Sequence, residues 1–360
     1  MVDAEPSEEA SRPLVPSQPL VLYPTEETAS PSRVASSAAA MAAAAAVEAG
    51  ACEEMLRAVE ASLARVRWRL RTGSKRRLLN DILFLCTGLR PVVLMDYGGT
   101  MPQLQENLCS LLHHARQESI ILRPLRVMVL KDMLYLIHIK GLAEHASRNT
   151  RSQHQLAFVD LETSYCKLLS NIEENDTVLE LGSIQDMFSS KFPVDTVVDL
   201  PIIQTGTTKQ HLQLPERTTD LECTGPLTAN SNLLVVDLSA FLETAKIALP
   251  SLNGWLLDYP VTYLFCNESA ETATKNLSQH SLHIYRVYVC RTRQSDVKQS
   301  EEELMSFSVP CEMSTKRDEE PWAKSFVARM NEKLRRCNQV WTSMRLEIEV
   351  FQSQSQVIVL

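Results

Sequence analysis

The stretch "LRVMVLKDMLYLIHI", residues Leu125 to Ile139, holds two apolar runs separated by the polar pair Lys131-Asp132. Two such runs joined by a short polar connection are typical of an antiparallel hairpin. Elsewhere along the chain, strand-like and helix-like segments alternate, which favours parallel pairs of strands. The sequence therefore predicts an α/β protein with a mixed, partly parallel sheet flanked by helices.

The rest of the 360 residues divides into a tail and one predicted domain. Residues 1–51 are rich in Ala, Pro, Ser and Glu, and they carry too little large apolar surface to offset the entropy lost on ordering. They are predicted to be a disordered tail, in which Met41, followed by five alanines, is a second candidate start. Residues 52–360 are predicted to form a single α/β domain, with a long exposed loop near residues 200–231.

Helices are predicted where apolar residues recur at intervals of three and four. The clearest of these patterns cover Glu53 to Leu70, Gln103 to Glu118 and Glu320 to Trp341. Weaker patterns predict helices over 164–171 and 239–249, and a polar loop over 143–153.

The composition excludes some classes of protein. Hydrophobic residues make up 44% and charged residues 22%, so the chain can bury a sizeable core. The formal net charge of −8 gives no overall attraction to nucleic acids or anionic membranes. The longest apolar region, Leu78 to Met95, is interrupted by Asp81, Arg90 and Pro91, so no membrane span is expected and the protein is predicted to be soluble.

The nine cysteines are scattered singly, and no two of them form a C-x-x-C pair. Several lie inside apolar runs, where a free thiol behaves as a small buried hydrophobe, and this favours a reducing compartment. We expect a cytoplasmic protein that also enters the nucleus. Three glycosylation sequons, at Asn175, Asn267 and Asn276, are accordingly predicted to be unused.

A basic segment spans residues 65–77 and contains six arginines and one lysine: Arg65, Arg67, Arg69, Arg71, Lys75, Arg76 and Arg77. One hypothesis is a nucleic-acid patch or a nuclear-import signal. The other is a solvated helix end, where cations suit the macrodipole. The second is preferred, and nucleic acid is not the expected partner, because the chain is acidic overall and only Trp68 interrupts the cations as an aromatic residue.

A candidate catalytic residue is Asp96 in "RPVVLMDYGGTM", Arg90 to Met101, because it follows an apolar strand and precedes a predicted helix. In open α/β sheets, ligands gather at the carboxyl ends of strands near helix N-termini. The structural alternative is that Asp96 accepts backbone N–H bonds as the cap of the helix that begins near Gln103.

The same residues resemble the first motif of the haloacid-dehalogenase superfamily, a hydrophobic strand followed by D-x-D-G-T. The resemblance implies that Asp96 is the nucleophile of a Mg²⁺-dependent phosphotransferase and that the hydroxyl of Thr100 supports it. The match departs at Gly98, where family phosphatases carry an aspartate as general acid, because glycine cannot transfer a proton. Lys209 could take the place of the family's lysine. Asp160 with Glu162, Asp199 or Asp237 could take the place of its metal-binding carboxylates.

No other cofactor or metal site is predicted. The chain contains no G-x-G-x-x-G, G-x-S-x-G or complete P-loop motif. His280 with His283 and the pair His113-His114 lack Cys or acidic partners at ligand spacing, and Cys337 is a weak candidate nucleophile.

The segments "RPVVLMDYGGT" and "GWLLDYPVTYLFC" resemble an uncharacterised animal protein family known by a chromosome 1 open-reading-frame label, over about Leu78 to Val289. This resemblance implies no activity, cofactor or site residue. The leading hypothesis is therefore a non-catalytic interaction domain with an unidentified protein partner. The phosphotransferase that uses Asp96 is the second hypothesis, and nucleic-acid binding through residues 65–77 is the third.

Overall fold

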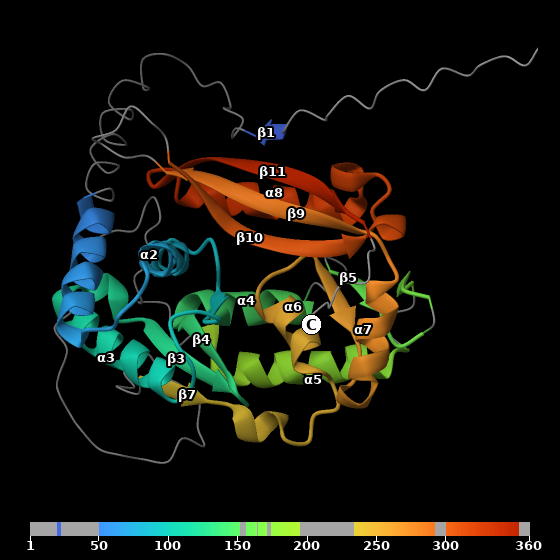
Figure 1. Cartoon of the computed structure of the whole chain (residues 1–360), viewed down its shortest axis with the longest axis horizontal. Coiled ribbons are helices and arrows are strands. Elements are labelled where there is room, and N and C mark those ends of the chain that lie inside the picture. Colours follow the sequence, from blue (N-terminus) through green and yellow to red (C-terminus); the bar gives the residue numbers. More distant parts are fainter. Residues whose placement is uncertain are drawn as a thin grey trace, which may run out of the picture.

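A computed structural model describes residues 20–22, 50–151, 156–163, 165–170, 174–194, 234–291 and 300–352 (Figure 1). Most of the predicted tail, with Met41, and the whole predicted loop near residues 200–231 lie outside the described residues. Within the described part, no helix is both long and apolar enough to cross a membrane.

The hairpin predicted from Leu125 to Ile139 is confirmed. It forms strands β3 (Leu125–Leu130) and β4 (Met133–His138), which pair antiparallel around a turn where Lys131 has a φ of 55°. Strand β2 (Val92–Leu94) adds antiparallel to β4, and β7 (Val235–Asp237) adds parallel to β3. This sheet has the order β2-β4-β3-β7, so the predicted α/β class with a mixed sheet is confirmed.

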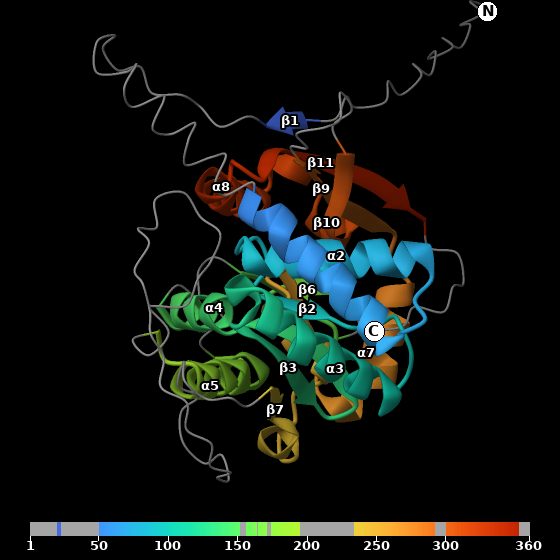
Figure 2. The same ribbon diagram turned by 90° about the vertical axis from the view of Figure 1, so that its left-hand side faces the viewer.

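Both faces of this sheet are buried, which explains why the hairpin is apolar almost throughout. On one face, Val127 and Leu134 share a core with α2 (Thr72–Cys86), α3 (Gln103–Glu118) and a helix over residues 50–66. On the other face, Met128 and Tyr135 pack with residues of α4 (Ile139–Arg151), α5 (Asp176–Lys191) and α6 (Leu249–Leu256). Figure 2 shows the helices on both sides of β3.

A second, smaller sheet also contains a parallel pair. Its strands are β6 (Lys167–Leu168), β5 (Ala157–Asp160) and β8 (Val261–Leu264), of which β5 and β8 run parallel. Helix α7 (Ala270–Ser278) follows β8 in the chain.

The third sheet is antiparallel and lies along the top of the molecule in Figure 1. It consists of β1 (Leu20–Leu22), β11 (Trp341–Phe351), β9 (Leu282–Arg291) and β10 (Ser300–Pro310), in that order. Helix α8 (Pro321–Arg336) packs on it through Trp322 and Phe326, whose rings contact those of Tyr285 and Phe307. Strand β10 is the edge that faces α2. Residues 20–22 were predicted to be disordered, but their apolar run pairs with β11.

Three local predictions were wrong. The predicted loop over 143–153 is largely helix α4, whose buried stripe includes Ala143 and Ala146, residues too small to mark the stripe by hydrophobicity. The predicted helix over 164–171 contains strand β6, which tertiary pairing with β5 holds extended. The predicted helix over 239–249 is only a 3-10 turn (Ser239–Leu242), and α6 begins later, where Pro250 suits its first turn.

The buried carboxylate of Asp258 connects helix α8, which packs on the third sheet, to the rest of the fold. Asp258 Oδ2 accepts a hydrogen bond from Lys333 Nζ at 2.7 Å, and its Oδ1 lies 3.1 Å from Arg329 Nη2. His145 of α4 lies on the same carboxylate, with Nδ1 3.8 Å from Oδ1, and its Nε2 donates to the carbonyl of Trp255 at 2.9 Å. Lys333 also donates to the carbonyl of Leu89 at 2.9 Å.

Burial and charge act in opposite directions on the pKa values of these groups. Burial alone would raise the pKa of Asp258, but Lys333 and Arg329 hold it far below its usual range, so the carboxylate is ionised. Burial lowers the pKa of His145 to about 4, despite the nearby Asp258. The imidazole is therefore neutral at pH 7, and the lowered pKa of Lys333 likewise reflects burial.

We predict that the substitution Asp258→Asn lowers the free energy of unfolding by about 3–5 kcal/mol, because it leaves the buried ammonium of Lys333 and the half-buried guanidinium of Arg329 without their anion. Urea unfolding followed by circular dichroism measures the change. Asp186→Asn, at an exposed position of α5, is the matched control and should stay within about 0.5 kcal/mol of wild type. Equal effects of the two substitutions would show that the cluster is not a main support of the fold.

We also predict that stability falls as the pH drops from about 6.5 to 4. In this window, His145 becomes protonated in the unfolded chain but stays neutral in the folded protein, where its pKa is about 4. The full loss from this residue is about 3 kcal/mol, at 1.36 kcal/mol for each unit of pKa. In His145→Gln, whose amide can still donate to Trp255, that part of the slope should be absent; an unchanged slope would contradict the assignment.

Candidate functional site

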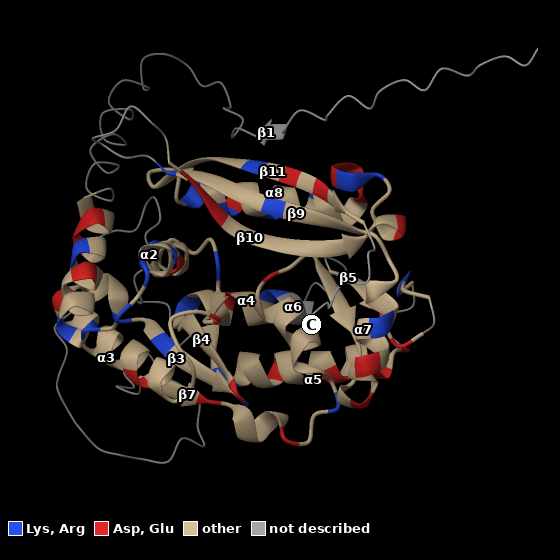
Figure 3. Cartoon of the chain, in the orientation of Figure 1, with Lys and Arg blue, Asp and Glu red and all other residues tan. Residues whose placement is uncertain are grey.

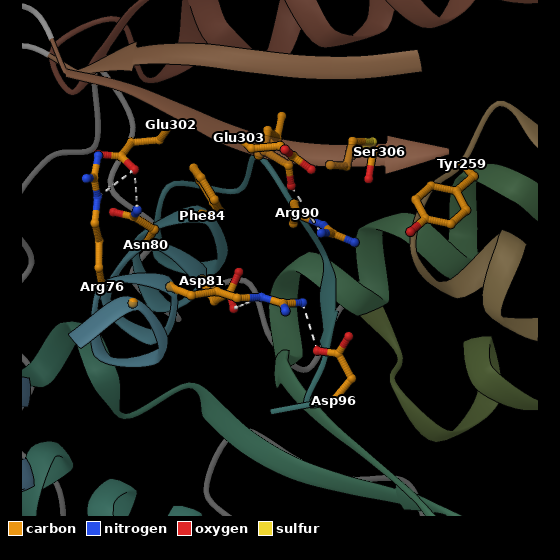
Figure 4. A pocket seen from close by; sticks show the side chains of 14 residues that line it. Arg76, Asn80, Asp81, Phe84, Arg90, Asp96, Tyr259, Glu302, Glu303 and Ser306 are labelled. Atoms are coloured by element: carbon orange, nitrogen blue, oxygen red, sulfur yellow. Dashed lines mark hydrogen bonds and ion pairs between the residues drawn. The ribbon is translucent and has the colours of Figure 1, made fainter. Parts of the chain in front are cut away.

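A cleft of about 560 Å³ lies between helix α2 and the edge strand β10 (Figure 4). One wall is a single face of α2, and the other is a run of consecutive residues of β10. Arg90 and Asp96 reach it from the ends of the segment that carries β2, and Tyr259 closes one end. The lining residues are Gly73, Arg76, Arg77, Asn80, Asp81, Phe84, Arg90, Asp96, Tyr259, Glu302, Glu303, Leu304, Met305 and Ser306.

The α2 wall is polar because the helix is amphipathic. Residues such as Leu78, Ile82 and Leu85 enter the core from the opposite side. On the cleft side, Arg76 Nη2 lies 2.6 Å from Glu302 Oε1, and Asn80 donates to Glu302 Oε2 at 2.7 Å. These contacts connect the two walls across the cleft.

Asp96 and Asp81 lie at the base of the α2 wall, around Arg77. The guanidinium of Arg77 lies 2.8 Å from Asp96 Oδ1 and stacks over the ring of Tyr97, 4.4 Å from its centroid. The hydroxyl of Tyr97 donates to Asp81 Oδ2 at 2.6 Å. Burial raises the pKa of Asp81 above its ordinary value, with this hydrogen bond and nearby arginines opposing the shift.

Arg90 differs from the other two arginines of the cleft. Only 8% of its surface is exposed, and its Nη1 donates to the carbonyl of Leu304 at 3.1 Å. Its Nε has no hydrogen-bond partner, and no carboxylate of the described residues lies within ion-pair distance of it. Figure 4 shows its guanidinium inside the cleft, on the side of Tyr259.

The two predicted catalytic residues, Asp96 and Thr100, are both exposed; Asp96 lines the cleft, whereas Thr100 is not among the lining residues. Asp96 does not cap α3, which was the structural alternative. The N-cap position of α3 is Pro102, and it has no side-chain cap bond. The side chain of Asp96 pairs with Arg77 instead.

Gly98 explains the departure from the haloacid-dehalogenase motif. Its φ of +90° is unfavourable for any other residue, and a Cβ there would lie 2.7 Å from Cζ2 of Trp68. Trp68 Nε1 also donates to the carbonyl of Gly98 at 2.8 Å. An aspartate, the motif's general acid, therefore cannot be accommodated at this position without moving Trp68.

Among the described residues, those that could support that motif are not gathered around Asp96. Lys209 and Asp199 lie outside the described residues. Asp160, Asp237 and Glu162 each accept a backbone N–H close to their own strands, from Glu162, Ser239 and Cys266 respectively. Within the part of the chain that the structure describes, no three His, Cys, Asp or Glu residues are placed to hold a metal ion.

Four of the seven cations of the basic segment 65–77 are paired with acidic neighbours. Figure 3 shows acidic and basic residues interspersed on these helices. The pairs are Arg65 with Glu118, Lys75 with Glu60, Arg76 with Glu302 and Arg77 with Asp96. An arginine already paired with a carboxylate is a poor phosphate ligand, so the segment does not form a continuous cationic surface.

Two charged residues in an apolar part of the sequence mark this site. Asp81 and Arg90 stand out as charges inside the longest apolar region, where they argue against a membrane span. Buried charges are rare unless they are paired, so their presence also marks a polar site inside the fold. Glu302, by contrast, lies in a charged segment of the sequence, and only the tertiary structure brings it to the cleft.

The asparagine side chains of two sequons make hydrogen bonds inside the fold. The side-chain amide nitrogen of Asn276 donates to the carbonyls of Leu161 and Thr163, each at 2.8 Å. That of Asn267 donates to the carbonyls of Ala245 and Ile247. Because a glycan would be attached to this nitrogen, the contacts favour the prediction that both sequons are unused.

We predict that Gly98→Ala destabilises the fold by about 2–4 kcal/mol, through the unfavourable φ and the overlap with Trp68. Gly99→Ala is the matched control: it also lies at positive φ, +141°, but a Cβ there has no neighbour within 4 Å. Thermal unfolding of both variants measures the difference. Equal losses would show that Trp68 does not exclude a side chain at position 98.

A protein-family model described as "Domain of unknown function (DUF4504)" matches residues 60–358. No curated protein and no solved structure matches the chain. The matched range includes every residue that lines the cleft.

Proposed function

Since the chain belongs to the family described as Domain of unknown function (DUF4504), its function has to be argued from its own site. We propose that it is a non-catalytic interaction domain that binds a protein partner through a carboxylate group of that partner. The binding site is the cleft between α2 and β10. The leading hypothesis from the sequence, a non-catalytic interaction domain, is thereby given a specific binding site.

The observation that supports this proposal is the state of Arg90. Removing a guanidinium from water is costly unless its charge and its N–H groups are satisfied. Arg90 is almost fully buried, yet within the described part of the chain it has one carbonyl acceptor and no carboxylate within ion-pair distance; Asp81 interacts with it electrostatically from farther away. A ligand carboxylate would supply a hydrogen-bonded counter-charge, and the planar guanidinium suits a carboxylate geometrically.

The surrounding charges favour a singly charged anion. Arg76 and Arg77 are engaged by Glu302 and Asp96, which leaves Arg90 as the available cation of the cleft. Asp81, Asp96, Glu302 and Glu303 also line it. Because like charges repel in a partly desolvated cleft, a phosphate dianion should be disfavoured relative to a carboxylate.

The other two hypotheses have less support. A haloacid-dehalogenase-like phosphotransferase would need a lysine and metal carboxylates beside Asp96, and none of the described residues that line the cleft is a lysine. Hydrolysis of p-nitrophenyl phosphate with Mg²⁺ that disappears in Asp96→Asn would support it instead. Nucleic-acid binding would depend mainly on Arg67, Arg69 and Arg71, the exposed arginines of the basic segment for which no carboxylate partner is seen among the described residues.

The location proposed from the sequence, the cytoplasm with the nucleus as a second site, remains a proposal. It is supported by the eight cysteines of the described part, all of which are free. It is also supported by the use of Asn267 and Asn276 in internal hydrogen bonds.

We predict that N-acetylalanine, a minimal carboxylate, binds saturably and shifts NMR signals of residues around the cleft, whereas N-acetylalaninamide does not. Arg90→Met should weaken the carboxylate by about 10–100-fold, the loss of a charge-assisted hydrogen bond. Arg69→Met, at an exposed arginine outside the cleft, is the matched control and should bind as wild type does.

A gain-of-affinity variant keeps the test valid if Arg90→Met folds poorly. Asp81→Asn removes a potential negative charge from the cleft, so it should strengthen carboxylate binding by a few fold or leave it unchanged. Saturable binding of inorganic phosphate without binding of N-acetylalanine would contradict the proposed function, as would carboxylate binding that Arg90→Lys and Arg90→Met leave intact.

A further inference from the structure

The backbone edge of strand β10 forms one wall of the cleft. Five consecutive residues, 302–306, line it. Because neighbouring residues of a strand point to opposite faces, consecutive lining residues show that the cleft meets the edge of the strand and not one of its faces. Among the described residues β10 is the last strand of its sheet, and an open edge is a template for a further strand.

Backbone groups of β10 that point away from β9 are partly occupied. The carbonyl of Leu304 accepts from Arg90 Nη1 at 3.1 Å, and that of Ser308 accepts from the hydroxyl of Tyr263 at 2.9 Å. In an antiparallel pair, residues two apart direct their backbone groups the same way. The pairing with β9 is regular from Met305 to Pro310, so the N–H and C=O of Ser306, two residues before Ser308, also point away from β9; Leu304 lies at the register shift between Glu303 and Met305. Ser306 is exposed and lines the cleft. It is the position where an added strand can exchange two hydrogen bonds.

Arg90 determines where such a strand must end. At Leu304 the outward carbonyl is already bound by the guanidinium, so a chain running along β10 from Ser306 cannot continue its pairing there. A chain that ends at this point places its terminal carboxylate there, and the negative charge of that carboxylate complements the guanidinium of Arg90. This direction places the added strand antiparallel to β10, as every strand of this sheet is to its neighbour.

We propose that the cleft binds the C-terminus of a protein partner as an added antiparallel strand on β10, with its terminal carboxylate on Arg90. The penultimate residue lies opposite Ser306, and the last residue lies opposite Met305. This inference rests on the proposed function, which itself requires only a carboxylate. Addition of a strand to an exposed edge gives affinity through main-chain bonds, and side-chain contacts with the facing wall give specificity.

The opposite wall suits the side chains of such a segment. Helix α2 lies across the cleft from β10 and crosses its direction: Figure 1 shows the helix almost end-on and the strand lengthwise. The helix contributes the ring of Phe84 (Figure 4). Tyr259 supplies a second ring at the end where the partner's chain would enter. The cleft volume of about 560 Å³ falls within the range of sites that enclose small ligands, which is room for a few residues of a chain end.

The test uses the full-length chain and a synthetic library of peptides whose last four residues are randomised and whose C-termini are free. The tightest binder is resynthesised with a C-terminal amide, with an N-methyl group on the penultimate residue, and with an N-methyl group on the last residue. We expect the amide and the penultimate N-methyl peptide to bind at least about tenfold more weakly. The last N–H points away from β10, so methylation there should change affinity by less than about threefold.

Variants of Ser306 test the same bond from the protein side. Ser306→Pro removes an N–H that points away from β9, a substitution that an edge strand tolerates. Ser306→Ala, the matched control, keeps that N–H and loses only the hydroxyl. The proline variant should lose about tenfold in peptide affinity, whereas Ser306→Ala should lose less than about threefold.

The outcomes separate the two levels of the argument. If N-acetylalanine binds through Arg90 but no library peptide binds better, or if penultimate N-methylation has no effect, the strand inference fails and the proposed function stands. If free-acid peptides bind no better than their amides, the C-terminal carboxylate is excluded. If neither N-acetylalanine nor any peptide binds, both are overturned.

Discussion

The ionised carboxylate of Asp258 is buried in the centre of the molecule and compensated by Lys333 and Arg329 of α8. Breaking such a pair leaves an uncompensated buried charge, which is far more costly than the pair itself is favourable. The three side chains therefore restrict how α8, and the sheet on which it packs, can sit on the layers below. His145 of α4 lies beside this cluster as a neutral imidazole and connects α4 to α6 by donating from Nε2 to the carbonyl of Trp255.

The same cluster positions the cleft. Lys333 donates to the carbonyl of Leu89, the residue before Arg90, so one lysine fixes both Asp258 and the segment that carries Arg90. Asp258, held at a φ of +61°, directly precedes Tyr259, which lines the other end of the cleft. A structural ion pair thus supports Arg90, which would bind the carboxylate, and Tyr259, which lies where the partner's chain would enter. The preorganised guanidinium would lose little entropy on binding, which is how a rigid site gains affinity.

How far the sequence alone predicts this arrangement differs between elements. The hairpin from Leu125 to Ile139 and helix α3 could be predicted because their apolar periodicity is strong and their ends carry turn signals. Helix α4 could not, because alanines form much of its buried stripe. The division into three sheets depends on pairings between strands far apart in the chain, such as β5 with β8, and local patterns do not encode these.

The site was less predictable than the fold. "LMDYGGT" draws attention to Asp96 because of its motif, yet the similar "LLDYPVT" contains the buried Asp258, and nothing in either stretch distinguishes an exposed carboxylate from a buried one. The two carboxylates differ in the basic residue that the fold places beside them: Arg77 lies beside Asp96, and Lys333 lies beside Asp258. Charges within apolar runs, such as Arg90, are the sequence feature that most directly marks the cleft.

A crystal structure of the full-length chain soaked with N-acetylalanine tests the central claim most directly. The account predicts that the carboxylate lies in the cleft between α2 and β10, with an oxygen about 2.7–2.9 Å from a guanidinium nitrogen of Arg90. It also predicts that Lys333 still bridges Asp258 and Leu89. A carboxylate bound elsewhere, or a well-occupied cleft in which Arg90 is turned away from the ligand, would contradict the account.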